Sequence, residues 1–119
     1  MHVAVIGASN KPERYAYQAV KLLREKGHTV FPIHPRIEEI EGLRVYPKIT
    51  DIPEKIDTVT LYVGAIASAG MAQDILNCRP RRIIFNPGAE NDHLEKQAKE
   101  AGIQTVRGCT LVMLKTGQF

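Results

Sequence analysis

The sequence VAVIGASNKPERY, residues 3–15, decides the fold of this chain. Its first four residues form a continuous apolar run, which is typical of a central strand covered on both faces. Gly7 follows at once, and Pro12 falls where the first turn of a helix is expected, with Ser9 or Asn10 available as the N-cap. A strand that passes through a glycine into a helix predicts the first unit of a parallel α/β sheet.

The rest of the chain repeats this alternation of apolar runs and helical spacing. Further strands are expected at His28–Ile33, Thr58–Val63, Arg82–Phe85 and Ile103–Val106, the last of them at a sheet edge. Helical spacing predicts buried faces formed by Ala16, Ala19, Val20 and Leu23 in the first helix, by Ala65, Ala69, Ala72 and Leu76 in the second, and by Leu94, Ala98 and Ala101, after an Asn91 cap, in the third. A brief strand is expected around Arg44–Tyr46, and a short helix within residues 109–119.

This order of elements predicts an α/β fold, a Rossmann-like three-layer sandwich with a five-stranded, mainly parallel sheet. The length of 119 residues predicts a single domain over residues 1–119. Ligands of such sheets bind at the carboxyl ends of the strands, near the point where the strand order reverses. Those ends are followed here by Gly7–Lys11, His34–Arg36, Val63–Ala65 and Asn86–Gly88, so we expect these four segments to converge.

Composition and charge exclude several classes of protein. The residues are 44% hydrophobic and 24% charged, as in ordinary globular domains. The net charge is only +3, and no basic run is interleaved with aromatic residues, so we expect an anionic small ligand and no nucleic acid. No apolar run reaches the roughly 18 residues of a membrane helix, so no membrane contact is expected. Cys78 and Cys109 lack the spacing of metal ligands, which indicates a cytoplasmic protein without a metal site.

The turn after the first expected strand has the chemistry of a phosphate site. Gly7 lets a ligand approach the main chain, and the helix that follows directs free amide groups and the positive end of its dipole at the same place. Ser9, Asn10, Lys11 and Arg14 add donors and positive charge. The sequence GASNKP nevertheless lacks the second and third glycines of the G-x-G-x-x-G dinucleotide motif. A plain strand-to-helix turn that holds no ligand therefore remains an alternative.

The end of the second expected strand narrows the choice of nucleotide. NAD sites typically place an Asp or Glu there, which accepts hydrogen bonds from the ribose hydroxyls. This chain instead reads IHPR over residues 33–36, and the first acid after it is Glu38. Arg36 would attract a phosphate on the ribose through paired, charge-assisted hydrogen bonds. Coenzyme A, with a 3′-phosphate, and NADP, with a 2′-phosphate, both fit this arrangement, whereas NAD fits less well.

Two longer stretches resemble a known family. VAVIGASNKPERYAYQAVKLLREKGHTVFPIHPR, residues 3–36, and EEIEGLRVYPKITDIPEKIDTVTLYV, residues 38–63, are similar to the stand-alone coenzyme A-binding domains. That family resembles the amino-terminal domain of the succinyl-CoA synthetase alpha subunit. The resemblance covers nearly the whole chain. Its most specific parts are the Gly-Ala-Ser turn followed by a proline, the basic residue after Pro35, and the Y-P-x-I-x-D-I-P-x-x-I-D stretch.

The resemblance implies roles for the candidate residues. Gly7–Lys11 would hold the pyrophosphate, with Arg14 beside it. Pro35 and Arg36 would contact the ribose and its 3′-phosphate, and Val63–Ala65 would border the adenine. The chain departs from the family at two ligand-facing positions, because His34 replaces the usual Asn before Pro35 and the fourth-strand loop reads Asn-Pro-Gly from residue 86. The full set of candidate binding residues is Gly7, Ala8, Ser9, Asn10, Lys11, Arg14, His34, Pro35, Arg36, Val63, Gly64, Ala65 and Asn86.

The sequence contains no recognisable catalytic set. His34 lies at the ligand end of a strand, where it either bonds a ribose or phosphate or only shapes the turn, and Cys109 has no evident base beside it. In the synthetase family, phosphohistidine chemistry needs a second domain and a partner subunit. We therefore expect a non-catalytic module that binds coenzyme A or an acyl-CoA, with a homodimer or an unknown protein partner as possible associates. The alternatives are an NADP-dependent oxidoreductase-like protein and a ligand-free Rossmann scaffold that binds a protein.

Overall fold

A sheet of five parallel strands, in the order β2-β1-β5-β6-β7, forms the centre of the molecule. The structure is a computed structural model that describes residues 1–119. The strands are β1 (His2–Ile6), β2 (Thr29–Ile33), β5 (Thr58–Leu61), β6 (Arg82–Phe85) and β7 (Gln104–Arg107). Every residue of β5 and β6 is buried, as expected of central strands covered on both faces. The predicted α/β sheet is therefore confirmed, and all five of its strands are parallel.

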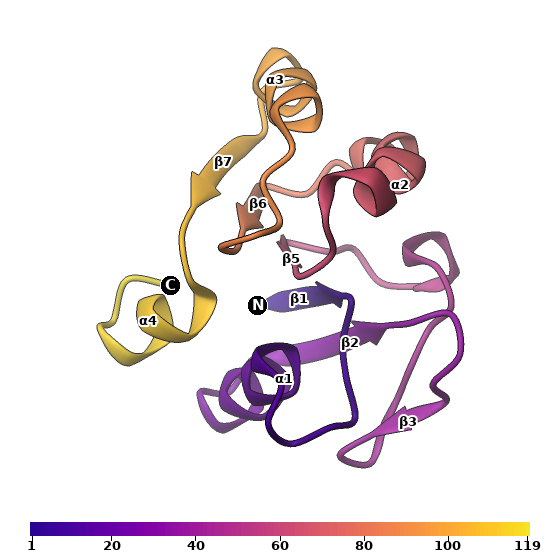
Figure 1. Cartoon of the computed structure of the whole chain (residues 1–119), viewed down its shortest axis with the longest axis vertical. Helices are drawn as coiled ribbons and strands as arrows, with labels where there is room; N and C mark the ends of the chain where they lie inside the picture. Colours follow the sequence, from indigo (N-terminus) through magenta and orange to yellow (C-terminus); the bar gives the residue numbers. More distant parts are fainter.

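Four helices cover the two faces of this sheet and complete a three-layer sandwich. They are α1 (Tyr15–Glu25), α2 (Ala65–Asn77), α3 (Asp92–Glu100) and α4 (Thr110–Lys115). α1 and α4 pack on one face, and α2 and α3 on the other (Figure 1). Successive side chains of a strand point to opposite faces, so Val5 packs in the core under α1 and α4, whereas Ile6 packs in the core under α2 and α3. None of the helices combines the length and the hydropathy that a membrane crossing requires.

The irregular segment between β2 and β5 forms a small antiparallel hairpin and one helical turn. These elements are β3 (Glu39–Ile40), β4 (Leu43–Arg44) and the 3₁₀ helix η1 (Ile49–Asp51). The predicted strand at Arg44–Tyr46 was therefore misplaced, because the chain leaves the hairpin after Arg44. Tyr46 instead forms a single parallel bridge with Ile33, the last residue of the edge strand β2.

The first helix begins later than the sequence predicted. α1 starts at Tyr15, with Arg14 in the N-cap position, and Pro12 lies in the turn before it. The Arg14 N–H donates to the Lys11 carbonyl (3.0 Å), which closes a separate turn ahead of the helix. The Ser9 hydroxyl accepts from the Lys11 N–H (3.1 Å) and so stabilises the loop. The predicted N-cap role of Ser9 or Asn10 was wrong.

The predicted face of α2 is only half right, because Ala72 and Leu76 pack against the core but Ala65 and Ala69 do not. Ser68 and Ile75 are its fully buried residues, whereas Ala65 and Ala69 are exposed. Ser68 is polar, but its hydroxyl accepts a hydrogen bond from the Asn91 side chain (2.8 Å), so its burial carries no unsatisfied group. In α3 the Asn91 cap is confirmed, since its side chain accepts from the N–H of Leu94 (3.0 Å). The predicted stripe there loses only its last member, because Ala101 is an exposed C-cap.

Candidate ligand-binding site

A cavity of about 720 Å³ opens at the carboxyl ends of β1 and β5. These strands are neighbours in the sheet, but the chain leaves β1 toward α1 on one face and β5 toward α2 on the other (Figure 1). Segments that diverge in this way leave a crevice between them, and in doubly wound sheets this crevice is where ligands bind. The strand topology therefore places the cavity where the sequence predicted a site.

All four of the segments that were predicted to converge contribute to the cavity wall. The lining includes nine of the candidate residues, namely Gly7, Ala8, Ser9, Asn10, Lys11, Arg14, His34, Pro35 and Val63. From the loop after β6 it includes Pro87. Four candidates lie outside the lining: Arg36, Gly64, Ala65 and Asn86.

Gly7 allows the loops after β1 and β5 to approach each other closely. Its φ is +84°, and a Cβ atom at this position would lie 2.7 Å from Cγ1 of Val63 and 3.2 Å from the carbonyl carbon of Tyr62. Both features exclude a side chain, since L-residues rarely adopt this φ and the neighbouring backbone cannot move far. The glycine is thus required to form the floor of the cavity, whether or not a ligand touches it.

Only some of the backbone N–H groups in the first turn are free to bind a ligand. The N–H groups of Gly7 and Ala8 both donate to the carbonyl of Ile33, at 3.1 and 3.2 Å, and so join the end of β1 to the end of β2. The N–H groups of Ser9 and Asn10 have no protein partner, and neither has that of Tyr15 at the start of α1. Unpaired N–H groups at a helix start and in its preceding loop are suited to binding an anion.

The charges around the cavity favour an anionic ligand. Lys11 and Arg14 are the charged residues of the lining, and no Asp or Glu belongs to it. Both side chains are exposed, and neither forms a salt bridge within the protein. Two basic side chains without acidic partners, next to unpaired N–H groups, can bind phosphate groups through charge-assisted hydrogen bonds.

His34 both shapes its turn and lines the cavity. Its Nδ1 accepts hydrogen bonds from the backbone N–H groups of Arg36 (3.0 Å) and Ile37 (3.3 Å). An Asn side chain at the start of a turn accepts from the backbone in the same way, so this departure from the family pattern preserves the geometry of the turn. Because Nδ1 is an acceptor, the ring proton lies on Nε2, which remains available as a donor.

The candidates outside the lining have different surroundings. Arg36 directly follows Pro35, which lines the cavity, and it is exposed and makes no ion pair. Asn86 is buried, and its amide is fully used within the protein. Its Nδ2 donates to the Thr60 hydroxyl (2.7 Å) and to the Leu61 carbonyl (2.8 Å), and its Oδ1 accepts from the N–H of Thr110 (2.8 Å). Asn86 therefore holds α4 against the end of the sheet.

Sequence reasoning missed several residues of the wall. They are Tyr15, Ala16, Ile37, Pro47, Tyr62, Ala67 and Met71, with Ile6 and Ile33 from the strands themselves. Tyr62 immediately follows β5, so the rule that predicted Val63 had the signal to find it as well. Burial raises the pKa of Tyr62 to about 12, against the lowering effect of the neighbouring Thr110 and Thr60 hydroxyls, so its hydroxyl stays protonated. Ala67 and Met71 depend on how α2 is rotated, which the sequence pattern did not reveal.

Comparison with known proteins identifies the family. Residues 1–115 match the family described as "CoA binding domain". The chain belongs to the CoA-binding domain family. A solved structure of an uncharacterized protein superposes with a TM-score of 0.93 at 40% identity, covering 99% of this chain and 97% of that one. The domain thus also occurs as a chain of about this length.

Other relatives carry the domain within a larger protein. The alpha subunit of ADP-forming acetate–CoA ligase II from Pyrococcus furiosus is 39% identical over 62 residues, which are 51% of this chain and 14% of the subunit. Acetyl-coenzyme A synthetase 1 of Ca. Korarchaeum cryptofilum superposes with a TM-score of 0.75 at 27% identity, covering 90% of this chain and 25% of the synthetase chain. This chain therefore spans only a small part of the ligases that it matches.

Proposed function

We propose that this CoA-binding domain binds coenzyme A or an acyl-CoA in the cavity between β1 and β5, as a module without a reaction of its own. The observation that carries the proposal is the cavity wall, where unpaired N–H groups, Lys11 and Arg14 meet without any acidic residue. Coenzyme A carries a pyrophosphate and a ribose phosphate, so it offers anionic groups to each of these donors. The family match supports coenzyme A, and the comparisons give no support to NADP.

Within this proposal the first turn holds the pyrophosphate and the second turn recognises the ribose phosphate. Ser9 and Asn10 offer their backbone N–H groups to the pyrophosphate, and Lys11 and Arg14 supply the charge. Arg36 directly follows Pro35, which lines the cavity, and its exposed, unpaired guanidinium reaches the 3′-phosphate from there. Val63 borders the adenine. Asn86 is left out of the binding set, because its amide is engaged in the core.

The expected biological setting follows from the same features. Since the sequence contains no recognisable catalytic set, we expect the module to present or carry its ligand to a partner protein. Related domains occur within ligase subunits, which supports a protein partner for this chain. The two unpaired cysteines fit a reducing, cytoplasmic compartment.

Calorimetric titration with four nucleotides tests the proposal. We expect coenzyme A to bind more tightly than dephospho-CoA by about 10-fold or more, because a charge-assisted contact to the 3′-phosphate contributes about 1.5–3 kcal/mol. NADP and NAD should bind more weakly than coenzyme A. Arg36→Ala should reduce the affinity for coenzyme A to near that for dephospho-CoA. Lys21→Ala, which removes an exposed charge from the far side of α1, is the matched control and should change neither affinity.

Three outcomes would contradict parts of this proposal. If Arg36→Ala still discriminates between coenzyme A and dephospho-CoA, another residue recognises the 3′-phosphate. Tighter binding of NADP than of coenzyme A would overturn the assignment of the ligand. Binding of none of the four nucleotides would overturn the function itself and favour a scaffold that binds a protein.

A further inference from the structure

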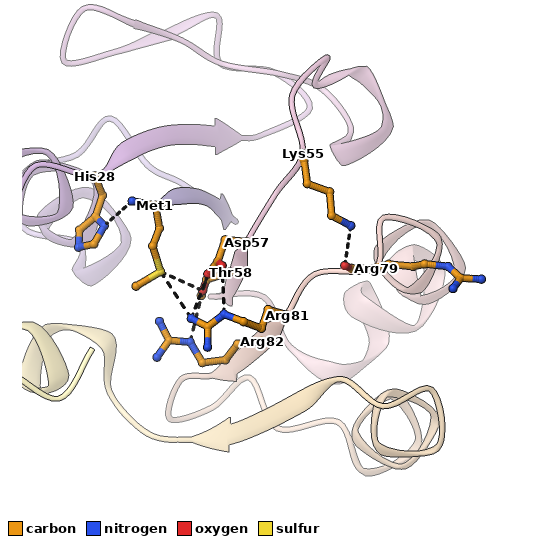
Figure 2. Close-up of polar contacts among 8 residues, drawn as sticks. All are labelled: Met1, His28, Lys55, Asp57, Thr58, Arg79, Arg81 and Arg82. Carbon is orange, nitrogen blue, oxygen red and sulfur yellow. Dashed lines mark hydrogen bonds and ion pairs between the residues drawn. The ribbon is translucent and has the colours of Figure 1, made fainter.

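A second group of polar side chains lies at the amino end of the sheet, opposite the cavity. We call His28, Asp57, Thr58, Arg81 and Arg82 the amino-edge cluster (Figure 2). These residues come from the amino ends of β2, β5 and β6, which the parallel sheet brings side by side. The cluster contains two arginines and a single carboxylate, so its charges do not balance.

The carboxylate of Asp57 accepts hydrogen bonds from two neighbouring side chains. Arg81 donates to it twice, from Nε to Oδ2 (3.1 Å) and from Nη2 to Oδ1 (3.3 Å). The Thr58 hydroxyl donates to the same Oδ1 (2.6 Å). Arg81 and Asp57 therefore form a complete pair, and no salt bridge joins Asp57 to Arg82.

Arg82 is left as a buried cation without a counter-ion. Its residue is only 6% exposed. Its Nε donates to the Thr58 hydroxyl (3.3 Å), but its Nη2 is buried and has no hydrogen-bond partner. Figure 2 shows its guanidinium extending to the side of the cluster where Met1 and His28 lie. Buried charges in proteins are normally paired, because an unpaired one costs several kcal/mol of desolvation.

The surroundings of Arg82 add positive charge and no acid other than the Asp57 carboxylate, which is already paired with Arg81. The ring of His28 lies on the same side, and its pKa is lowered by burial, by the amino group of Met1 and by Arg82, against a smaller raising effect of Asp57. The Met1 amino group contacts Nδ1 of His28 at 3.2 Å. The ring of Phe119 covers the Arg82 guanidinium at 4.5 Å and also stacks edge-on against His28. A cation–π contact of this kind offsets only about 0.5–2 kcal/mol, less than the desolvation of a buried charge.

We propose that the amino-edge cluster is a second binding site, for a small oxyanion, in which Nη2 of Arg82 is the principal donor and Phe119 is the cover. A phosphate or a carboxylate that enters beside Arg82 gives the buried guanidinium its missing acceptor. The ring of Phe119, which lies beyond the end of α4 at Lys115 and covers the guanidinium, moves aside for it. This site lies at the opposite edge of the sheet from the cavity, so it is independent of the binding of coenzyme A.

Two-dimensional amide NMR of the ¹⁵N-labelled protein tests this site directly. Inorganic phosphate and succinate are titrated separately at constant ionic strength, with chloride as the reference anion, so that the response to a phosphate and to a carboxylate can be compared. We expect saturable shifts at His28, Thr58, Arg82 and their neighbours. Chemical-shift changes at Gly7–Lys11 would report anion binding in the cavity, so they are analysed separately. Saturable shifts confined to Gly7–Lys11, or shifts at the cluster that do not saturate, would overturn the proposal.

Variants identify the donor and the cover. Arg82→Met keeps the apolar stem and should abolish the saturable shifts, whereas Arg79→Met, the matched control on an exposed neighbour, should leave them intact. Phe119→Ala should tighten binding about 2- to 10-fold, because the anion then displaces no cation–π contact. If Arg82→Met is unfolded, Arg82→Lys serves instead and should weaken binding at least several-fold. Unchanged binding in the folded Arg82 variant, or in Phe119→Ala, would overturn the assigned role of that residue.

Discussion

At the scale of the residue, Gly7 shows how one position links the fold to the site. It joins the end of β1 to the loop after β5, and a side chain there meets both an unfavourable φ of +84° and the Cγ1 atom of Val63 at 2.7 Å. The same residue closes the floor of the cavity. A single glycine therefore sets the distance between the two loops that diverge at the switch point.

We predict that Gly7→Ala lowers the free energy of unfolding by about 2–4 kcal/mol, because strain at a positive φ and overpacking against the backbone add together. Chemical denaturation by urea measures this loss. Gly70→Ala is the matched control, since Gly70 lies in α2 with open space around it, and alanine should raise the stability by about 0.5–1 kcal/mol. A Gly7→Ala protein as stable as wild type would show that the two loops are free to separate.

Residues that directly follow strands were predictable from the sequence, and those on helix faces were not. Gly7, His34 and Val63 come after apolar runs, so the rule for parallel sheets places them at one edge. Met71 lines the cavity only because α2 turns the face that contains Ser68 toward the sheet. In that rotation Ser68 accepts a hydrogen bond from Asn91, a long-range contact that apolar periodicity does not reveal.

At the scale of the element, the β3–β4 hairpin contains a strained backbone position that a substitution should relieve. Glu41 has a φ of +52° and Gly42 a φ of +76°, so both residues of the two-residue loop adopt the left-handed region. A type I′ turn requires this conformation, and Asn-Gly is its favoured sequence. Glu41 is a poor choice for the first position, since a long side chain gains nothing there that compensates for the strain.

Glu41→Asn should raise the free energy of unfolding by about 0.5–1 kcal/mol, because Asn tolerates the left-handed region. The anchor of the hairpin to α1 survives the change, since the Arg24 guanidinium donates to the backbone carbonyl of residue 41 (2.6 Å). Urea denaturation of the variant measures the gain. Glu39→Asn in β3 has the same change of side chain without the positive φ, so it should produce no gain. Equal gains in the free energy of unfolding of both variants would show that removal of a negative charge, and not relief of strain, causes the effect.

The start of α1 illustrates why element bounds are less predictable than element order. Pro12 is a good first residue of a helix, so the sequence favoured a start there. The structure uses residues 11–14 as a separate turn, which places Arg14 at the N-cap and keeps its side chain at the cavity. Local signals fix which elements exist, whereas the path of the loop depends on the contacts of Gly7 and Ala8 with Ile33.

At the scale of the whole molecule, the parallel sheet separates two chemical environments. Helix starts and unpaired N–H groups gather at the carboxyl edge, around the cavity, whereas the amino edge receives the helix ends and the amino-edge cluster. The aligned peptide dipoles make the ends of helices slightly negative, so basic side chains are favoured there. Lys55 is an example, since it donates to the carbonyls of Cys78 (3.0 Å) and Arg79 (2.8 Å) after the end of α2 (Figure 2).

The amino-edge cluster should make the protein less stable in acid, in two steps. The pKa of His28 is lowered in the folded state by burial, the Met1 amino group and Arg82, so the unfolded chain binds the proton more readily. Stability therefore falls as the pH drops below 6.5, the ordinary His value, toward the lowered one. Burial alone would raise the pKa of Asp57, but hydrogen bonds from Arg81 and Thr58 outweigh it and the pKa is lowered. A second loss of stability follows as the pH falls below 3.8.

Urea denaturation at a series of pH values from neutral to acid separates these two steps. His28→Gln removes the group that titrates first, so its free energy of unfolding should stay level where that of wild type begins to fall. Asp57→Asn should remove the second step and lower the stability at neutral pH, because Arg81 then loses a charged partner. The direction of the pH dependence is decisive. If a carboxylate stabilised the protonated form of His28, the protein would instead become more stable as the pH falls. Stability that rises between pH 7 and 5, or an unchanged first step in His28→Gln, would show that a lowered pKa of His28 does not cause the first step.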